Sequence, residues 1–426
     1  MKKLLALLLI SATAFGQDKL EVISMEETRR IEATLSSDEM QGRRTFTPGI
    51  EKAGQFIAAE FEKIGLKKLG NNDSYLQSFA MIRPKVTSVK LDINGNTIDS
   101  KKVSISSVQK TLSITEKSGY EIISIPRGAN FVNEWRKYSA SAKNTVVFVD
   151  STHEQIFARA TQRGGQFYQT QPNIVFIIQN ETPASFKIEA TQDLTEMPLA
   201  NVVGIIPGKS KANEYVIFSG HYDHLGINTR NMKDNDSIYN GANDDAAGTT
   251  AMIMLAKYYK ALNQNERTLV FAAFTAEEIG GFGATYFSKQ FDPKQVMAMF
   301  NIEMIGTESK WGKNSAYITG FDKTTMGEIL QKNLAGTGFN FYPDPYPDQQ
   351  LFYRSDNATL ARLGVPAHTI STAKMDQEPH YHKASDEIGT LDMDNMSSII
   401  KAIALSARGI VAGKETPTRV DSSSLR

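Results

Sequence analysis

The chain has 426 residues, of which 41% are apolar, and its 47 lysine and arginine residues balance 47 aspartate and glutamate residues. A balanced charge provides no field that would attract nucleic acid or an anionic membrane, so small or peptidic partners are favoured. Because one hydrophobic core stops growing at roughly 250 to 300 residues, the length predicts two structural units.

The first 16 residues have the pattern of a secretory signal peptide. Two lysines follow Met1, residues 4–10 are apolar, and small residues lead up to Gly16. The apolar run is far shorter than the roughly 20 residues of a membrane span, so we expect no integral membrane segment. We predict cleavage before Gln17 and a secreted or periplasmic protein. The chain has no cysteine, which excludes a disulfide framework and a lipid-modified cysteine.

Residues 17–85 are expected to form the N-terminal part of the main domain. Pro48 can open a helix and Gly65 can close it. Between them, apolar residues recur at helical spacing and predict a helix that packs on a sheet, namely Ile50, Ala53, Ile57, Phe61 and Ile64.

Residues 86–199 have a different pattern. Apolar and polar residues alternate before Asn94-Gly95, which is typical of a hairpin turn. This region contains no catalytic motif, and we predict a mostly β insertion or lid domain. Further short β-like runs follow at 120–125, 145–149 and 173–178.

From residue 200 to residue 413, strand-like apolar runs alternate with amphipathic helices, which is typical of an α/β layer fold. Residues 414–426 are expected to form a flexible tail. The predicted strands of the main domain are 215–219, 268–274, 297–302 and 366–370.

Histidine and acidic side chains follow these strands directly. Sites in open α/β sheets form beyond the carboxyl ends of strands, so we expect these side chains to converge. Asp244 instead precedes a helix whose expected inner face is Gly248, Met252, Leu255, Ala256 and Tyr259. Imidazole and carboxylate together bind a hard-to-borderline divalent cation. The set is His221, Asp223, Asp244, Glu277, Glu278, Glu303 and His382.

Each motif alone also has an ordinary structural interpretation. Asp244 could cap its helix, and Glu303 inside an apolar strand could form a buried ion pair. His224 is expected to shape the pocket or cap a turn. Adjacent side chains at a strand end diverge, so Glu278 could bind a metal ion while Glu277 faces the bound water as general base. The coincidence of all the clusters predicts a metal hydrolase more specifically than any one of them.

These residues resemble the secreted zinc aminopeptidases related to bacterial leucyl aminopeptidase and aminopeptidase Y, whose fold also occurs in glutamate carboxypeptidase II and the transferrin receptor. The similarity covers residues 35–79 and 199–413, and it includes the motif LSSDEMQGRR at 35–44. The resemblance implies a three-layer α/β/α mixed-sheet zinc exopeptidase domain of the phosphorylase/hydrolase-like type. It also implies two Zn²⁺ ions bridged by Asp244, one bound by His221 and Glu303 and the other by Glu278 and His382.

The resemblance also implies roles for the neighbouring residues. Glu277 matches the catalytic base, Asp223 matches the acid that orients the first histidine, and Tyr381 matches a tyrosine that stabilises the tetrahedral intermediate. The chain departs from the family at two positions. Most relatives carry aspartate where Glu303 stands, and a stretch that usually ends in histidine ends here in Asn357.

The expected function is the removal of N-terminal residues from peptides with a free N-terminus, and the oligomeric state stays open. A glutaminyl-peptide cyclotransferase is one alternative, although such proteins usually lose the pattern that residues 244–248 retain. A carboxypeptidase is another, and it would need a basic group such as Arg354. A non-catalytic binding module, like the receptor members of this fold, is disfavoured because every expected ligand position is occupied by a metal-binding residue type.

Overall fold

A computed structural model describes residues 19–161, 167–168, 171–230, 232 and 235–425. The expected signal peptide and its cleavage point lie outside the described residues. The chain divides into two compact units, the first made of Met1–Gln77 with Ala200–Arg426 and the second of Ser78–Leu199. Among the described residues, no helix has both the length and the apolar character that a membrane span requires.

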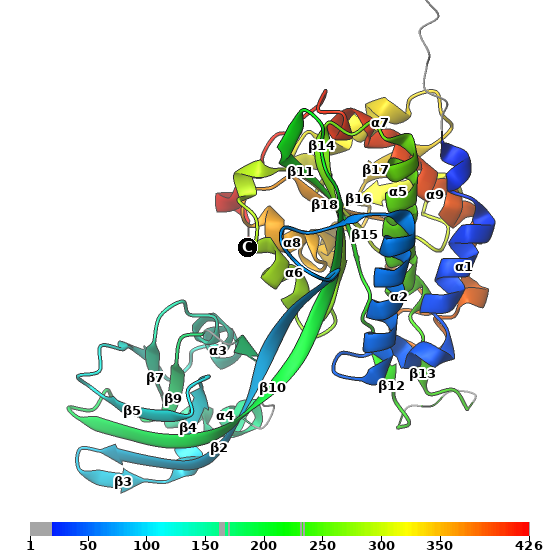
Figure 1. The fold of residues 1–426 in the computed structure, drawn as a ribbon. Helices are drawn as coiled ribbons and strands as arrows, with labels where there is room; N and C mark the ends of the chain where they lie inside the picture. The colour runs from blue at the N-terminus through cyan, green and yellow to red at the C-terminus, as the bar shows by residue number, and fades with distance from the viewer. Residues whose placement is uncertain (1–18, 162–166, 169–170, 231, 233–234, 426) are drawn as a thin grey trace, which may run out of the picture. The chain divides into compact units, whose positions relative to one another are not determined.

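The first unit is built on a mixed sheet in the order β17-β16-β18-β15-β11-β14-β10 (Figure 1). β11 runs parallel to β14 and β15, and β15 runs parallel to β18, whereas β10 and β16 run antiparallel to their neighbours β14 and β18. The central strands are buried on both faces, as expected for parallel strands covered by helices. The bounds are β1 Lys67–Lys68, β10 Phe186–Ile206, β11 Lys211–His221, β14 Arg267–Phe274, β15 Val296–Ile302, β16 Ser315–Ile318, β17 Asn340–Pro343 and β18 Ala367–Ser371.

Helices cover both faces of this sheet. Along β11, Val216 and Phe218 pack against one helical layer, whereas Ile217 belongs to a separate core on the other face. Figure 1 shows α1, α2, α5 and α9 on one side of the strands and α6 and α8 on the other. The mixed α/β fold with a central mixed sheet is therefore confirmed. The helices are α1 Met25–Leu35, α2 Pro48–Ile64, α5 Ala247–Leu262, α6 Phe282–Ser288, α7 Met326–Leu334, α8 Asn357–Ala361, α9 Met393–Ser406 and α10 Arg408–Val411.

Two helices show how well their patterns predicted them. α2 begins at Pro48 and ends at Gly65, whose φ of 75° lies in the left-handed region, as expected. For α5 the prediction of one apolar face was too narrow. Every residue from Ala247 to Ala256 is buried, because α5 lies between the sheet and the helices α1, α2 and α9.

The second unit contains a four-stranded sheet in the order β4-β9-β7-β6, in which β6, β7 and β9 are parallel. One face packs against Phe131 and Phe157 of two helices, and the other packs against strands β2, β5 and β10. Asn94-Gly95 forms the expected two-residue turn. The unit contains more strand than helix, and the helices α3 and α4 lie between its parallel strands along the chain, as parallel pairing requires long connections. Its elements are β2 Leu76–Ile93, β3 Asn96–Ile98, β4 Val103–Ser106, β5 Thr111–Thr115, β6 Glu121–Ile125, α3 Phe131–Ser139, β7 Thr145–Val149, α4 Glu154–Thr161, β8 Phe167–Tyr168 and β9 Ile174–Ile178.

The domain boundaries also differ from those expected. The second unit begins at residue 78 rather than 86, because β2 and β10 are long strands that run across the boundary. The expected flexible tail at 414–426 is packed over its described part. Val420 is buried and its N–H donates to Gly364, while Arg419 donates to the carbonyl of Val296 at 2.7 Å.

Candidate metal centre

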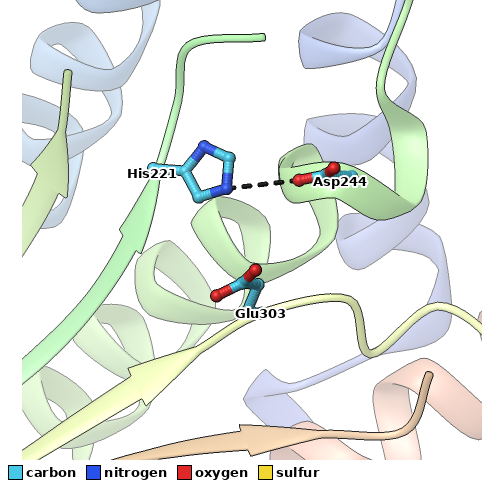
Figure 2. A group of neighbouring side chains, drawn as sticks. All are labelled: His221, Asp244 and Glu303. Carbon is cyan, nitrogen blue, oxygen red and sulfur yellow. Dashed lines mark ion pairs between the residues drawn. The ribbon is translucent and has the colours of Figure 1, made fainter. Parts of the chain in front are cut away.

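Three predicted ligands from different elements meet at one edge of the sheet of the first unit. His221 is the last residue of β11, Glu303 follows β15, and Asp244 lies in the turn Ala242–Ala246 before α5. Their ligand atoms lie within 4.8 Å of one another, and His221 Nε2 is 3.2 Å from Asp244 Oδ1 (Figure 2). We call His221, Asp244 and Glu303 the first donor group.

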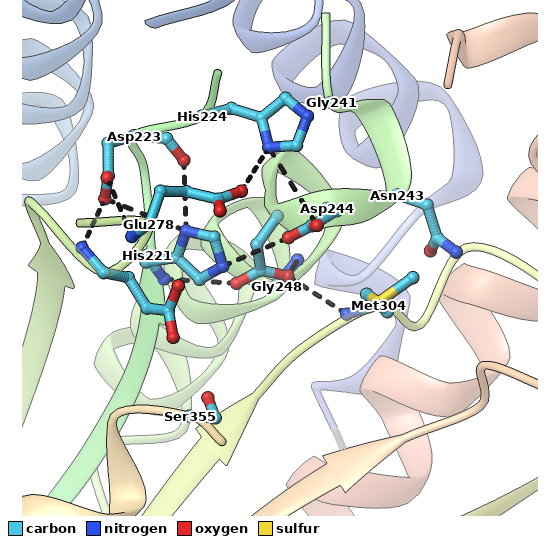
Figure 3. A network of polar contacts seen from close by, with 12 residues as sticks. His221, Asp223, His224, Gly241, Asn243, Asp244, Gly248, Glu278, Met304 and Ser355 are labelled. Carbon is cyan, nitrogen blue, oxygen red and sulfur yellow. Dashed lines mark hydrogen bonds and ion pairs between the residues drawn. The ribbon is translucent and has the colours of Figure 1, made fainter. Parts of the chain in front are cut away.

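The ring of His221 is oriented by main chain rather than by the expected carboxylate. Nδ1 lies 3.0 Å from the backbone oxygen of Asp223, whereas the Asp223 carboxylate is 3.8 Å away. A proton on Nδ1, donated to that carbonyl, leaves a lone pair on Nε2. Nε2 is buried and has no hydrogen-bond partner among the described residues. The carboxylate of Asp223 instead accepts the backbone N–H groups of Glu277 and Glu278 (Figure 3).

A second donor group, Asp244, Glu278 and His382, lies beside the first. His382 Nε2 is 3.2 Å from Asp244 Oδ2 and 3.3 Å from Glu278 Oε2. Burial alone would lower the pKa of His382, but these two contacts raise it to about 10. Burial alone would raise the pKa of Glu278, but contacts with His224 and His382 lower it to about 2. Asp244 thus has one oxygen toward each donor group.

His224 also lies next to the second donor group. The sequence analysis expected it only to shape the pocket or cap a turn. Its Nδ1 lies 2.7 Å from Glu278 Oε1 and 4.0 Å from Asp244 Oδ2 (Figure 3). Both ring nitrogens are buried, and the ligand atoms of His224, Asp244 and Glu278 all lie within 4.8 Å of one another, so His224 offers a further donor atom beside the second group. The position three residues after His221 was the available signal.

The paired acids at 277 and 278 lie on a tight turn after β14. Ala276, just before them, has a φ of 62°, and the N–H groups of Gly280 and Gly281 return to the carbonyl of Glu277. The side chain of Glu278 belongs to the second donor group, whereas that of Glu277 belongs to neither set of three ligand atoms that lie within 4.8 Å of one another. Burial raises the pKa of Glu277 well above its usual value.

Two further acids hold the ligand loops together. Asp245 accepts the backbone N–H groups of His221, Gly248 and Met304, and so joins the ends of β11 and β15 to the start of α5. Asp386 accepts the N–H groups of residues 243 and 244. The sequence analysis named Asp244 of the Asp244-Asp245 pair as the ligand, and the structure adds that Asp245 accepts from main chain.

The charge of this region favours a cation. Burial raises the pKa of Glu303 to about 7 and that of Asp356 to about 8, and both carboxylate oxygens of Asp356 are without partners among the described residues. Burying negatively charged carboxylates without a counter-charge costs free energy, and a bound divalent cation would supply the compensating positive charge. The donor set therefore fits zinc, which takes imidazole and carboxylate ligands. The carboxyl groups are Asp223, Asp244, Asp245, Glu277, Glu278, Glu303 and Asp356, and the imidazoles are His221, His224 and His382.

Tyr381 is partly exposed and lies beside His382. Its ring stacks on His382 with centroids 3.9 Å apart, and Arg354 donates weakly to its hydroxyl at 3.5 Å. Tyr381, Arg354 and Glu303 line the same pocket. Its other lining residues are Met304, Tyr317, Thr319, Leu351, Ser355, Thr369, Ser371 and Met375.

Of the two departures from the family, Asn357 has a clear structural role. Its amide donates to the carbonyls of Phe352 and Ala367, and it accepts the hydroxyl of Thr369. A buried side chain that is engaged in this way is not free to contact a substrate. Glu303 keeps its carboxylate in the first donor group despite the additional methylene.

Comparisons with known proteins agree with this geometry. Residues 201–407 match the model of peptidase family M28. A probable leucine aminopeptidase from Trichophyton verrucosum (strain HKI 0517) is 30% identical over 206 residues, which cover 46% of this chain and 53% of that protein. This chain therefore spans about half the length of the curated relatives it matches.

Solved structures share the fold at low sequence identity. A zinc aminopeptidase from Bacillus subtilis has a TM-score of 0.57 and 16% identity, covering 92% of this chain and 97% of that one. A glutaminyl cyclase from Porphyromonas gingivalis has a TM-score of 0.50 and 10% identity, covering 91% and 99%. The convergent histidines and carboxylates of the metal centre all lie within residues 201–407, the part of this chain that matches peptidase family M28.

Proposed function

We propose that the protein is an exported zinc aminopeptidase that binds two zinc ions around Asp244. One observation carries this proposal: the two oxygens of Asp244 each lie 3.2 Å from a different histidine, His221 and His382. A carboxylate shared in this way suits a bridging ligand in hydrolases whose two ions lie about 3.5 to 4 Å apart. The M28 domain and the similarity to a probable leucine aminopeptidase support the choice of zinc and of peptide N-termini.

The first ion would be held by the first donor group. For the second ion we propose Asp244, Glu278 and His382, with His224 positioning Glu278. Replacing His382 by alanine should remove one zinc ion per chain, whereas His224→Ala should keep both ions and weaken the second. If His224→Ala loses an ion and His382→Ala keeps two, the ligand assignment of the two histidines is reversed.

When bound, the ions would polarise the scissile carbonyl and acidify a water, lowering its pKa from 15.7 towards ~7. Glu277 would accept the proton of the attacking water and return it to the leaving amine. Asp223 keeps Glu277 in place by accepting its backbone N–H at 3.0 Å. Tyr381, which lines the pocket with Glu303, would donate its hydroxyl proton in a hydrogen bond to the developing oxyanion. The acidic surroundings would bind the substrate's free α-amine.

Two other activities share the fold and are separable by substrate. Similarity to a glutaminyl cyclase concerns the fold alone, and intact residues 244–248 favour hydrolysis. A carboxypeptidase would use Arg354 to bind the substrate carboxylate. A panel of leucyl-p-nitroanilide, an N-terminal glutaminyl peptide and an N-acetylated peptide with a free carboxylate should show turnover of the first substrate only.

Zinc content and chelator sensitivity test the proposal directly. Protein comprising residues 17–426 should contain two zinc ions per chain, lose leucyl-p-nitroanilide hydrolysis on chelation, and regain it when zinc is restored. Activity that persists in the chelated, zinc-free protein would rule out the proposed mechanism.

Export is a separate part of the proposal. Expressed with its own first 16 residues in a Gram-negative host, the protein should appear in the periplasm or the medium with Gln17 at its N-terminus. Retention of the intact N-terminus in the cytoplasm would contradict it.

A further inference from the structure

The N-terminal motif at residues 35–44 contains an arginine that is completely buried beside the metal centre. The side chain of Arg43 has no exposed surface, and residues 41, 42 and 43 all have positive φ angles. A Cβ at Gly42 would lie 2.5 Å from the carbonyl oxygen of Tyr239, so only glycine allows the turn to pack this closely. The turn therefore inserts Arg43 between segments that are distant in sequence.

The guanidinium of Arg43 donates to four main-chain oxygens. Nε donates to Tyr222 at 2.9 Å, Nη1 to Leu35 at 2.7 Å and Asn240 at 2.5 Å, and Nη2 to Gly241 at 2.9 Å. Tyr222 directly follows His221, and Gly241 lies three residues before Asp244. One rigid planar group thus spans the two loops whose side chains form the 3.2 Å contact in the first donor group.

The charge of Arg43 acts on the same region. None of the ion pairs among the described residues includes Arg43, because its N–H groups are directed at carbonyls. Burial lowers its pKa, and the acids Glu32, Asp386, Asp223 and Asp244 counteract that effect. The positive charge of Arg43 is therefore balanced by acids of this region, although its N–H groups bind main-chain carbonyls.

We propose that Arg43 is a positioning residue of the metal centre, which sets the distance between the His221 loop and the Asp244 turn and so determines how tightly zinc is bound. Lysine cannot replace it, because its three donors radiate from one nitrogen and cannot reach four carbonyls on both edges of a plane. The inference rests on the proposed zinc site, but it concerns binding affinity rather than turnover.

Arg267 provides a matched control. It is equally buried and donates to the carbonyls of Ile410 and Glu415 at 2.8 and 2.7 Å, with further bonds to Glu214 and Thr416. It begins β14, whose other end leads to Glu277, so the two lie roughly 20 Å or more apart at 3.3 Å per residue. Arg267→Lys should therefore disturb a similar set of bonds without affecting the donors.

The experiment measures the zinc affinity of Arg43→Lys and Arg267→Lys by competition with a chromogenic chelator, together with the visible spectrum of the cobalt-substituted proteins and their melting temperatures. Loss of a residue that orients ligands typically weakens metal binding about 10- to 100-fold. We expect that loss, with an altered cobalt spectrum, for Arg43→Lys. Arg267→Lys should melt at a lower temperature and keep the zinc affinity and cobalt spectrum of the unaltered protein.

If Arg43→Lys does not fold, Arg43→Gln, which keeps two N–H donors without the charge, takes its place. Unchanged affinity and spectrum in the folded Arg43 variant would overturn the inference. The same loss of affinity in Arg267→Lys at equal loss of stability would also overturn it, because the role would then be purely structural. If the unaltered protein binds no zinc, the proposed function fails, whereas normal zinc binding that does not respond to Arg43 removes only this inference.

Discussion

The two donor groups share Asp244 but differ in how firmly the protein holds them. The first group uses the ends of two central strands, and its His221 is only 1% exposed. The second depends on His382, a loop residue with a φ of 55° whose side chain is 38% exposed. A ligand on a buried strand end has little freedom, whereas a ligand on an exposed loop must be ordered when the ion binds. The ion in the first group should therefore be the tighter of the two.

Substitution of Asp244 is expected to have the largest effect on zinc content, because Asp244 belongs to both donor groups. Asp244→Asn keeps the size of the side chain but removes the charge that two cations would share. We expect zinc content to fall from two ions per chain to fewer than one, measured by atomic emission after dialysis. Asp92→Asn, which changes a partly exposed acid of the second unit, is the control and should keep both ions. Two ions retained by Asp244→Asn would exclude a bridging role.

Glu277 tests whether chemistry can be separated from metal binding, because its side chain is in neither donor group. Glu277→Gln should lower kcat by about 10² to 10⁴-fold, the range for loss of a general base, and keep two zinc ions. Steady-state kinetics and metal analysis on the same sample check this. A variant with near-normal turnover would remove Glu277 from its proposed role.

The difference between the groups predicts stepwise release of zinc. Titration with a chelator should remove the ion of the second group first and that of the first group at a higher chelator concentration. His382→Ala should abolish the early step and leave the late one, and His221→Ala should do the reverse. Release of both ions in a single step from all three proteins would show that the difference in burial has no thermodynamic consequence.

The smallest effect concerns pH. In the metal-free protein, burial raises the pKa of Glu303 from 4.5 to about 7. The folded state thus binds this proton more tightly than the unfolded state, so the associated stability is complete below pH 4.5 and is lost as the pH rises through about 7. His382, whose pKa is raised from 6.5 to about 10, acts in the same direction between those values.

Zinc binding requires the deprotonated carboxylate and therefore becomes stronger over the same interval. The increase in melting temperature caused by zinc should be greater at pH 8 than at pH 5.5, as measured by calorimetry with and without chelator. Glu303→Gln, which has no proton to lose, should reduce this pH dependence. A metal-free protein that became more stable from pH 5.5 to 8 would contradict the assigned direction.

Much of the candidate site could be predicted because its residues follow recognisable strands. Apolar runs placed the ends of β11, β14 and β15, and His221, Glu278 and Glu303 are located by those ends. His224 was assigned to pocket shape or a turn and not to the donors, because its position after His221 does not indicate the direction of its ring. Asp223 was expected to orient His221 through its carboxylate, but its backbone oxygen does so and the carboxylate holds the turn at Glu277 instead.

The sequence by itself determined the α/β class, the order of the central strands along the chain and the residue types available to bind a cation, because these depend on local periodicity and on chemistry carried by each side chain. Only the tertiary structure decided which atoms face one another. Arg43 shows the reason, since three of its four acceptors lie 179 to 198 residues away along the chain. They are main-chain carbonyls, which every residue type carries, so no sequence pattern could indicate them.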